Sequence, residues 1–128
     1  MLKPLLKIFL PPIIIFLFHV IMIAVFNIYT IFPAFDIPMH FLGGLSIGVS
    51  AIILLNIFKS KITTPKWFLF LWIISLTVMI AVLWEFAEFT ADYFFQTQMQ
   101  LSLADTMGDL LMGMLGGMTA GIWFIKKS

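Results

Sequence analysis

Residues 67–94 read WFLFLWIISLTVMIAVLWEFAEFTADYF, and this stretch decides the fold class. From Trp67 to Trp84 it carries no charged side chain, and the whole stretch exceeds the roughly 20 mostly apolar residues that a helix needs to cross a bilayer. Three carboxylates, those of Glu85, Glu88 and Asp92, follow near its end. The stretch therefore predicts a transmembrane helix with one acidic end.

The rest of the chain repeats this pattern. Three further apolar stretches, at about residues 7–31, 37–58 and 103–125, are long enough to span, so four crossings are expected. Short connections make sequential helices antiparallel neighbours, which predicts an all-α fold: one compact four-transmembrane-helix bundle formed by residues 1–128 as a single domain. A signal peptide is not expected, because the first apolar stretch is too long and lacks a small-residue cleavage site.

The composition agrees with a lipid environment. Of the 128 residues, 62% are hydrophobic and 10% are charged, and the mean hydropathy is +1.15. So few charges cannot coat a soluble globule, which leaves membrane lipid as the expected partner of the surface. The net charge of +1 and the lack of a basic stripe argue against a nucleic-acid partner, and the absence of cysteine excludes disulfides, thiolate metal sites and cysteine nucleophiles.

The basic residues predict the orientation. With four spans, all seven of them fall on the same side of the membrane, and the positive-inside rule makes that side cytoplasmic. We therefore expect a multi-pass protein of the cell membrane with both termini in the cytoplasm. The seven are Lys3, Lys7, Lys59, Lys61, Lys66, Lys126 and Lys127.

The acidic residues all fall in the opposite, extracytoplasmic half. They are Asp36, Glu85, Glu88, Asp92, Asp105 and Asp109. Asp36 with His40, and Asp105 with Asp109, are spaced i, i+4, whereas the three acids of the third span follow an i, i+3, i+7 pattern about 60° wide. Each set therefore occupies one face of its helix, and these faces are expected to converge inside the bundle, since a charge exposed to hydrocarbon is costly.

No lysine is available to compensate these carboxylates, because all the lysines belong to the other side. Either several carboxyls are protonated, or a cation is bound, or the outer groups reach water. Carboxylates with a histidine suit Zn²⁺, Mn²⁺ or iron, whereas carboxylates with water suit Ca²⁺ or Mg²⁺. The candidate ligands are His40, Glu85, Glu88, Asp105 and Asp109.

Each of these residues also has a purely structural interpretation. Asp36, Asp92 and Asp105 could lie at the membrane interface, where the first and last of them could be helix N-caps. Glu85, Glu88 and Asp109 could be protonated packing contacts. His19 lies near mid-membrane on the first span, where a hydrogen-bonded core histidine is the simpler reading.

The second and fourth spans share a pattern. Asp36, His40, Gly44 and Gly48 recur 69 residues later as Asp105, Asp109, Gly113 and Gly117, and the same offset carries His19 onto Glu88. This suggests two hairpin halves related by a pseudo-twofold axis along the membrane normal, as in some transporters. The alternative is that both helices merely pack through small residues four apart, which is the leading reading of the glycines.

Three motifs carry a family resemblance. Asp36 to Gly44 reads DIPMHFLGG, Leu83 to Phe89 reads LWEFAEF, and Asp105 to Leu110 reads DTMGDL. In order and spacing they resemble the YjdF-like family of bacterial membrane proteins, with a looser similarity to VanZ-like proteins. The resemblance covers roughly residues 36–117 and implies that the acidic motifs matter, but that family brings no assigned reaction.

Three functions remain open. The first is an outward-facing site for a divalent cation, acting hydrolytically on a lipid or envelope substrate with Glu85 or Glu88 as general base. The second is an accessory membrane protein whose buried acids only specify packing. The third is a proton- or cation-coupled transporter using Glu85, Glu88 and His19, which would need a homodimer to form a path. Whether the protein is an enzyme, and on which substrate, is left undecided.

Overall fold

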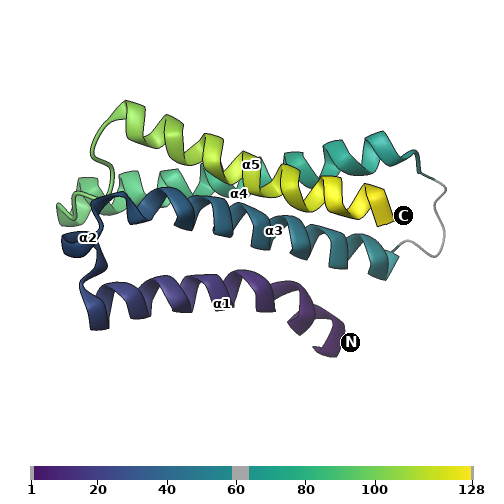
Figure 1. The fold of residues 1–128 in the computed structure, drawn as a ribbon, viewed down its shortest axis with the longest axis horizontal. Coiled ribbons are helices and arrows are strands. Elements are labelled where there is room, and N and C mark those ends of the chain that lie inside the picture. Colours follow the sequence, from purple (N-terminus) through teal and green to yellow (C-terminus); the bar gives the residue numbers. More distant parts are fainter. Residues whose placement is uncertain (1, 59–63, 128) are drawn as a thin grey trace.

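The computed structural model describes the backbone of residues 2–58 and 64–127, and the side chains of residues 6–57 and 64–127. Over this part of the chain every regular element is helical, and four helices are long and apolar enough to cross a membrane, which confirms the all-α bundle (Figure 1). The order is α1 Leu2–Phe26, α2 Ile28–Ile31, the 3₁₀ helix η1 Pro33–Phe35, α3 Asp36–Phe58, α4 Lys66–Phe95 and α5 Leu103–Lys127. That residues 1–128 form a single domain stays a prediction.

The first helix ends earlier than the hydropathy predicts. Asn27 has a left-handed backbone conformation with φ of 46°, and its N–H donates to the carbonyl of Ile23. An asparagine in this conformation is a common helix terminator, because its side chain tolerates positive φ. Residues 28–35 then form two short helical turns rather than the last turn of the span. This corner brings Tyr29 next to the start of α3, which matters for the site described below.

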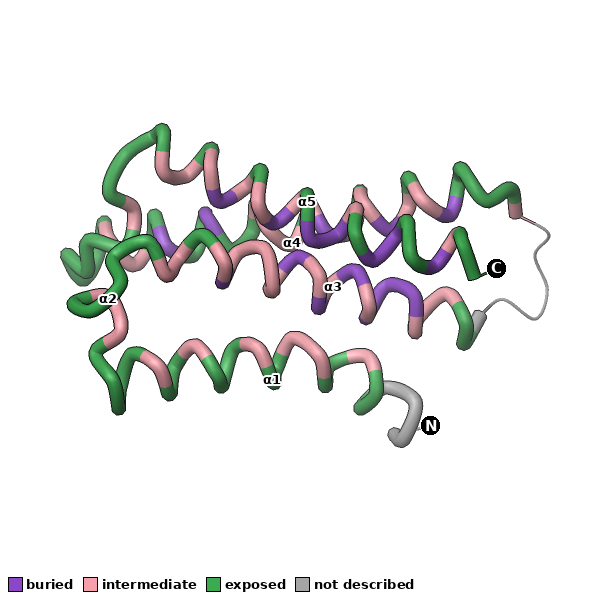
Figure 2. The backbone as a smooth tube through the Cα atoms, in the orientation of Figure 1, coloured by how far each residue is buried: buried purple, intermediate pink, exposed green. Residues whose placement is uncertain are grey.

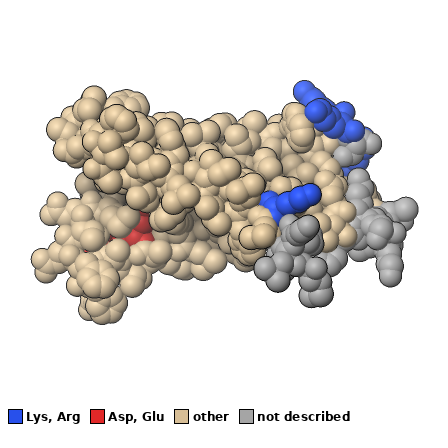
Figure 3. Space-filling model, turned by 90° about the horizontal axis from the view of Figure 1, so that it is seen from below, with Lys and Arg blue, Asp and Glu red and all other residues tan. Residues whose placement is uncertain are grey.

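The two ends of the bundle differ in charge. Both termini lie at the end opposite to α2 (Figure 1), and the lysines visible in Figure 3 lie at that same end, whereas acidic atoms appear in a recess at the other. Lys66 donates a hydrogen bond from Nζ to the carbonyl of Ile125, which ties the start of α4 to the end of α5. The side chains of Lys3, Lys59 and Lys61 lie outside the described residues.

Glycines allow α3 and α5 to approach each other closely. A Cβ built on Gly44 would overlap the carbonyl oxygen of Gly113, and one on Gly116 would overlap the carbonyl oxygen of Phe41. Helices in lipid gain affinity through such close backbone contact, because apolar burial alone does not favour protein over lipid. The packing role expected for Gly44 and Gly113 is thus what their surroundings require.

The 69-residue offset corresponds to residues that face each other across α3 and α5. Gly44 faces Gly113, and Gly48 faces Gly117, so residues separated by that offset oppose each other across α3 and α5, which run parallel (Figure 1). A twofold axis between the two helices would produce this pairing. The outer helices break the symmetry, however. The backbone of α4 approaches both α3 and α5 closely, whereas among the long helices the backbone of α1 comes this close to α3 alone.

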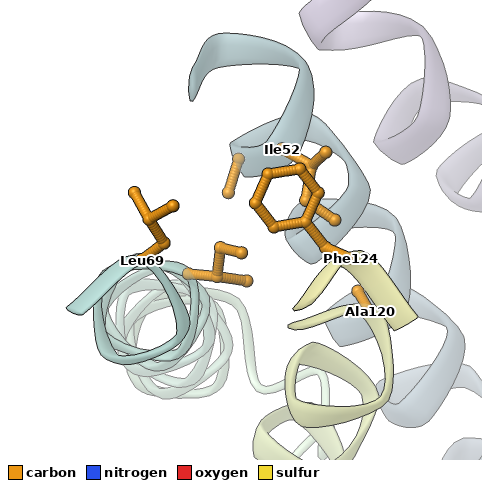
Figure 4. Packing of buried hydrophobic residues seen from close by; sticks show 6 residues of the cluster. Ile52, Leu69, Ala120 and Phe124 are labelled. Atoms are coloured by element: carbon orange, nitrogen blue, oxygen red, sulfur yellow. The ribbon is translucent and has the colours of Figure 1, made fainter. Parts of the chain in front are cut away.

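Toward the lysine end of the bundle, apolar side chains of α3, α4 and α5 pack into one cluster. Figure 4 shows Ile52, Leu69, Ala120 and Phe124 pointing toward one another from α3, α4 and α5. Ile73, also in this cluster, is fully buried. Helix α1 has no buried residue in its described part, as Figure 2 shows. The tightly packed unit therefore consists of α3, α4 and α5, with α1 attached along one side.

Candidate metal site at His40

Four carboxylates from three helices gather around the imidazole of His40 on α3. Its Nε2 lies 3.5 Å from Asp36 Oδ1 and 3.8 Å from Asp109 Oδ1, and its Nδ1 lies 3.8 Å from Glu85 Oε1. Glu88 on α4 belongs to the same gathering, with an oxygen within 4.8 Å of ligand atoms of His40 and Glu85. The predicted convergence of His40, Glu85, Glu88 and Asp109 is therefore what the fold produces.

These residues form two possible ligand sets that share His40. One set joins Asp36, His40 and Asp109, and the other joins His40, Glu85 and Glu88, and within each set the ligand atoms lie within 4.8 Å of one another. The sets lie at different ring nitrogens, since Nε2 faces the two aspartates and Nδ1 faces Glu85. A single ion would therefore use one nitrogen and leave the other for a hydrogen bond.

Because these side chains are buried, negative charge on the carboxylates is costly unless a proton or a positive charge compensates it. The side chains of Glu85 and Asp109 are each 6% exposed, that of His40 is 10% exposed, and only Asp36 reaches 24%. Within the described side chains, every ion pair has His40 as its basic partner. Even as an imidazolium, His40 brings one positive charge to four carboxyl groups. The basic side chain that pairs with these carboxylates is thus a histidine from within the gathering, His40.

Among the described residues, Glu85 carries a fully buried side-chain oxygen that has no hydrogen-bond partner. Its Oε2 accepts a hydrogen bond of 2.9 Å from the side-chain amide of Gln100, which also donates to the Glu85 carbonyl at 3.0 Å. Its Oε1 is buried, has no hydrogen-bond partner and points toward His40. A buried oxygen of this kind loses its hydration without replacement, so it needs a proton, a donor or a cation close by.

Two of the other carboxylates, those of Glu88 and Asp36, are also oriented by uncharged donors. Trp84 Nε1 donates to Glu88 Oε1 at 2.7 Å, one helical turn away on α4. Tyr29 donates from its hydroxyl to Asp36 Oδ1 at 3.0 Å. Neutral donors fix the direction of a carboxylate without neutralising its charge. Tyr29, Trp84 and Gln100 were not predicted in these roles from the sequence. For Trp84 alone, the i, i+4 spacing to Glu88 indicates the contact.

His19 joins the site through Tyr29. Its Nε2 lies 2.8 Å from the Tyr29 hydroxyl, whose single proton is already directed at Asp36. His19 must therefore donate through Nε2–H in this arrangement. Burial, together with the negative charge of Asp36, raises the pKa of Tyr29 above its ordinary value, so its hydroxyl keeps its proton. This hydrogen bond links α1 to α2, and the bond from Tyr29 to Asp36 continues the link to α3. His19 is thus a partnered histidine at the edge of the site.

Asp92 and Asp105 stay outside the gathering and have structural roles. Asp92 accepts hydrogen bonds from the Met99 N–H at 2.7 Å and the Gln100 N–H at 2.8 Å, which shapes the loop that holds Gln100. Asp105 lies in the first turn of α5, where its N–H donates to Ser102 Oγ and its carboxylate accepts from the Leu101 N–H. The structural interpretation fits both, although the N-cap of α5 is Ser102 rather than Asp105.

The comparison with protein families supports the membrane character of the chain. The family described as "Predicted membrane protein (DUF2238)" has a sequence profile that matches residues 2–127. This supports the expectation of a membrane-protein family without an assigned reaction, whereas the YjdF-like and VanZ-like resemblances stay predictions. No curated protein and no solved structure matches the chain.

Proposed function

Because the chain belongs to the DUF2238 family of membrane proteins, we propose that it works inside the bilayer, where it binds a divalent cation at His40. The observation that carries this proposal is the distribution of carboxylates around one imidazole. Aspartates from α3 and α5 face Nε2, and a glutamate from α4 faces Nδ1. The ligands in this proposal are Asp36, His40 Nε2 and Asp109. Asp36 was not among the ligands predicted from the sequence, whereas Asp105, which was, belongs to neither possible ligand set.

Distances support this choice of ligands. Two ligand atoms that each lie about 2.0–2.2 Å from a tetrahedral ion are roughly 3.3–3.6 Å apart. The 3.5 Å and 3.8 Å separations at Nε2 are close to that value and too long for good hydrogen bonds. One nitrogen with two carboxylates favours Zn²⁺, Mn²⁺ or iron, whereas Mg²⁺ or Ca²⁺ would use the carboxylates and water.

Glu85 has a natural part in such a site. A histidine that binds a metal through one nitrogen usually donates its other N–H to a carboxylate, which fixes the ring and the tautomer. The unpartnered Glu85 Oε1, 3.8 Å from Nδ1, lies where that acceptor belongs. Charge favours the cation as well, since a divalent ion offsets two of the buried negative charges that hydrocarbon penalises.

The chemistry that a cation supplies here is activation of a bound water for hydrolysis. Glu88, which faces the same gathering and is not in the proposed ligand set, is the candidate general base; the earlier alternative, Glu85, orients His40 instead. The substrate class proposed is a lipid or another envelope component. The location proposed is the bacterial cell membrane with both termini in the cytoplasm, which the lysine distribution and the likeness to the YjdF-like motifs support.

Thermal unfolding of the purified protein with each divalent ion tests the cation site. A ligand at 100 times its dissociation constant stabilises the folded state by about 2.7 kcal/mol, so a bound ion should raise Tm measurably. His40→Gln and Asp109→Asn should abolish the rise. Asp105→Asn is the matched control, because it removes a carboxylate of the same half that lies outside both ligand sets. It should lower Tm slightly through the weakened cap and leave the ion-dependent rise intact.

Two results would contradict the proposal. One is a native protein, stripped of metal, whose Tm responds to no divalent ion. The other is an ion-dependent rise that persists in full in His40→Gln. The first result, together with retained stability and phenotype in Asn and Gln replacements of all four carboxylates, would favour the accessory-protein alternative.

A proton-handling role is the second candidate, because titratable groups form a row from α1 to α5. His19 Nε2 lies 2.8 Å from the Tyr29 hydroxyl, and this hydroxyl lies 3.0 Å from Asp36 Oδ1. The same Asp36 oxygen lies 3.5 Å from His40 Nε2. A transport path would have to continue toward the lysine end, where the apolar cluster around Ile73 fills the described interior. A dimer would have to supply the missing path, and for this reason transport ranks below cation binding.

A further inference from the structure

A cavity of about 140 Å³ lies beside the His40 site, where α1 separates from α4. Its walls come from α1, α3 and α4, and one residue of α5 reaches it. Seen from the side of α1, the surface is hollowed at this half of the molecule, and acidic atoms are visible inside (Figure 3). The cavity follows from the asymmetry of the fold, because the backbone of α1 approaches α3 closely, whereas α1 reaches α4 through longer side chains, as in the ring contact of Phe16 with Trp84.

The body of the cavity is apolar. Ile15, Ile47 and Ile80 line it with hydrocarbon from three helices. Two hydroxyls also line it, but Ser46 donates to the carbonyl of Gly43 at 2.7 Å and Thr77 donates to the carbonyl of Ile73 at 2.9 Å. Since both hydroxyl protons are used within their own helices, the cavity offers little to a polar occupant along this length.

One end of the cavity is polar. His19, Asp36 and His40 line it there, next to the proposed cation ligands. On α1 the lining extends from Pro12 to His19, which spans about 10 Å along a helix. The cavity is thus elongated along the helices, apolar over its length and polar at its extracytoplasmic end.

We propose that this cavity binds the hydrocarbon chain of a membrane phospholipid, with the lipid headgroup directed at the His40 site. Its volume is too small for a helix of another protein, whose diameter with side chains is about 10–12 Å. The groups at its rim, Phe16 and Trp84, are 49% and 38% exposed, so the rim faces the lipid itself. Their rings meet edge to face at 6.0 Å, which leaves an aromatic border between bilayer and cavity.

The identification of that lipid as a substrate rests on the proposed function, whereas binding of the chain does not need the cation. The two are therefore tested separately. The lipid would be drawn from the bilayer beside α1, because the hollow in Figure 3 lies on the side of the bundle from which α1 is seen.

Gly43 gives a clean way to fill the cavity. It lines the cavity, and a Cβ added there would meet no atom within 4 Å. Gly43→Leu therefore places a side chain in the space that the lipid chain would use, without a backbone clash. Gly108→Leu is the matched control, because a Cβ at Gly108 also meets no atom within 4 Å and this glycine does not line the cavity.

The experiment uses the full chain in phosphatidylethanolamine and phosphatidylglycerol vesicles that contain a trace of phospholipid with a photoreactive diazirine acyl chain. After irradiation, mass spectrometry of peptides locates the labels. The buried cavity residue Met39 should be labelled along with Leu111 and Leu115, which are exposed on α5 and report ordinary lipid contact. Gly43→Leu should reduce labelling of Met39 relative to Leu111 by about tenfold, equivalent to about 1.4 kcal/mol of binding free energy. Gly108→Leu should leave the ratio unchanged.

Equal labelling of Met39 in Gly43→Leu and in the native chain would overturn the proposal, as would absence of label at Met39 in the native chain. Crosslinks from cavity residues to a second copy of the chain in place of lipid would also overturn it. Repeating the measurement after metal removal separates the two proposals, because chain binding should persist in a protein whose Tm does not respond to any ion.

Discussion

The hydroxyl of Ser50 on α3 donates a hydrogen bond of 2.6 Å to the carbonyl oxygen of Ile8 on α1. In an unbroken helix that carbonyl would accept the N–H of residue 12, but residue 12 is a proline and has none. A carbonyl left without a donor is costly in hydrocarbon, and a serine of a neighbouring helix is one of the few groups that can satisfy it. The prolines of α1 thus create a docking point for α3.

Ser50→Ala should weaken the attachment of α1. We expect a loss of about 0.5–2 kcal/mol in the free energy of unfolding, because the Ile8 carbonyl, which Pro12 cannot serve as a donor, loses the Ser50 hydroxyl. Ser46→Ala is the control, since the Ser46 hydroxyl bonds to its own helix at the Gly43 carbonyl. Steric-trapping unfolding in bilayers measures both. Equal losses in the two variants would show that the bond between helices has no special weight.

Gly44→Ala should be strongly destabilising. The added Cβ would lie 2.6 Å from the carbonyl carbon of Gly113, so α3 and α5 would have to separate. We expect a cost of about 3 kcal/mol or more, at the upper end for overpacked cores. Gly108→Ala has open space around its Cβ and should instead stabilise α5 by about 0.5–1 kcal/mol. The folded fraction of each variant after reconstitution, measured with the same unfolding assay, checks both signs.

Gln100→Asn should weaken cation binding without removing a ligand. Asparagine is shorter by one methylene, so its amide cannot hold the Glu85 carboxylate as Gln100 does. Groups that orient a metal ligand directly typically contribute about tenfold to 100-fold in metal affinity, and because Gln100 acts on His40 through Glu85 we expect a loss of about tenfold. The control is Gln98→Asn, at an exposed position with φ of 58° that asparagine tolerates well. Calorimetric titration with the ion that raises Tm measures the difference; unchanged affinity in Gln100→Asn would separate Glu85 from the cation site.

The orientation can be tested with single cysteines, because the natural chain has none. Leu101→Cys lies in the exposed loop between α4 and α5, at the acidic end, and Thr64→Cys lies just before α4, at the other end. A membrane-impermeant maleimide added to whole cells should label the first and spare the second until the membrane is opened. The reverse pattern would place the lysines outside and contradict the positive-inside assignment.

Much of the fold was readable from composition and spacing. Hydropathy predicted four spans, and α3, α4 and α5 begin and end within a few residues of the predicted bounds, since lipid exposure demands continuous apolar stretches. The four-residue spacing of glycines predicted close packing, and Gly44 does lie against Gly113. The end of α1 was misjudged, because the left-handed turn at Asn27 depends on one dihedral angle that hydropathy does not report.

The gathering of His40, Glu85, Glu88 and Asp109 was also predicted, because polar groups in a small bundle must turn inward. The specific contacts between these groups were not predicted. Asp36 lies 3.5 Å from His40, whereas the Asp105 carboxylate accepts the N–H of Leu101 just before α5, although the two occupy equivalent places in the 69-residue pattern. The sequence alone therefore determined the spans, the segregation of lysines from carboxylates and the identity of the polar faces, since these are local properties of each segment. Only the tertiary structure decided that Tyr29 and Gln100 orient carboxylates and that α1 separates from α4 to leave a cavity, because helix rotation and spacing depend on all the packed neighbours at once.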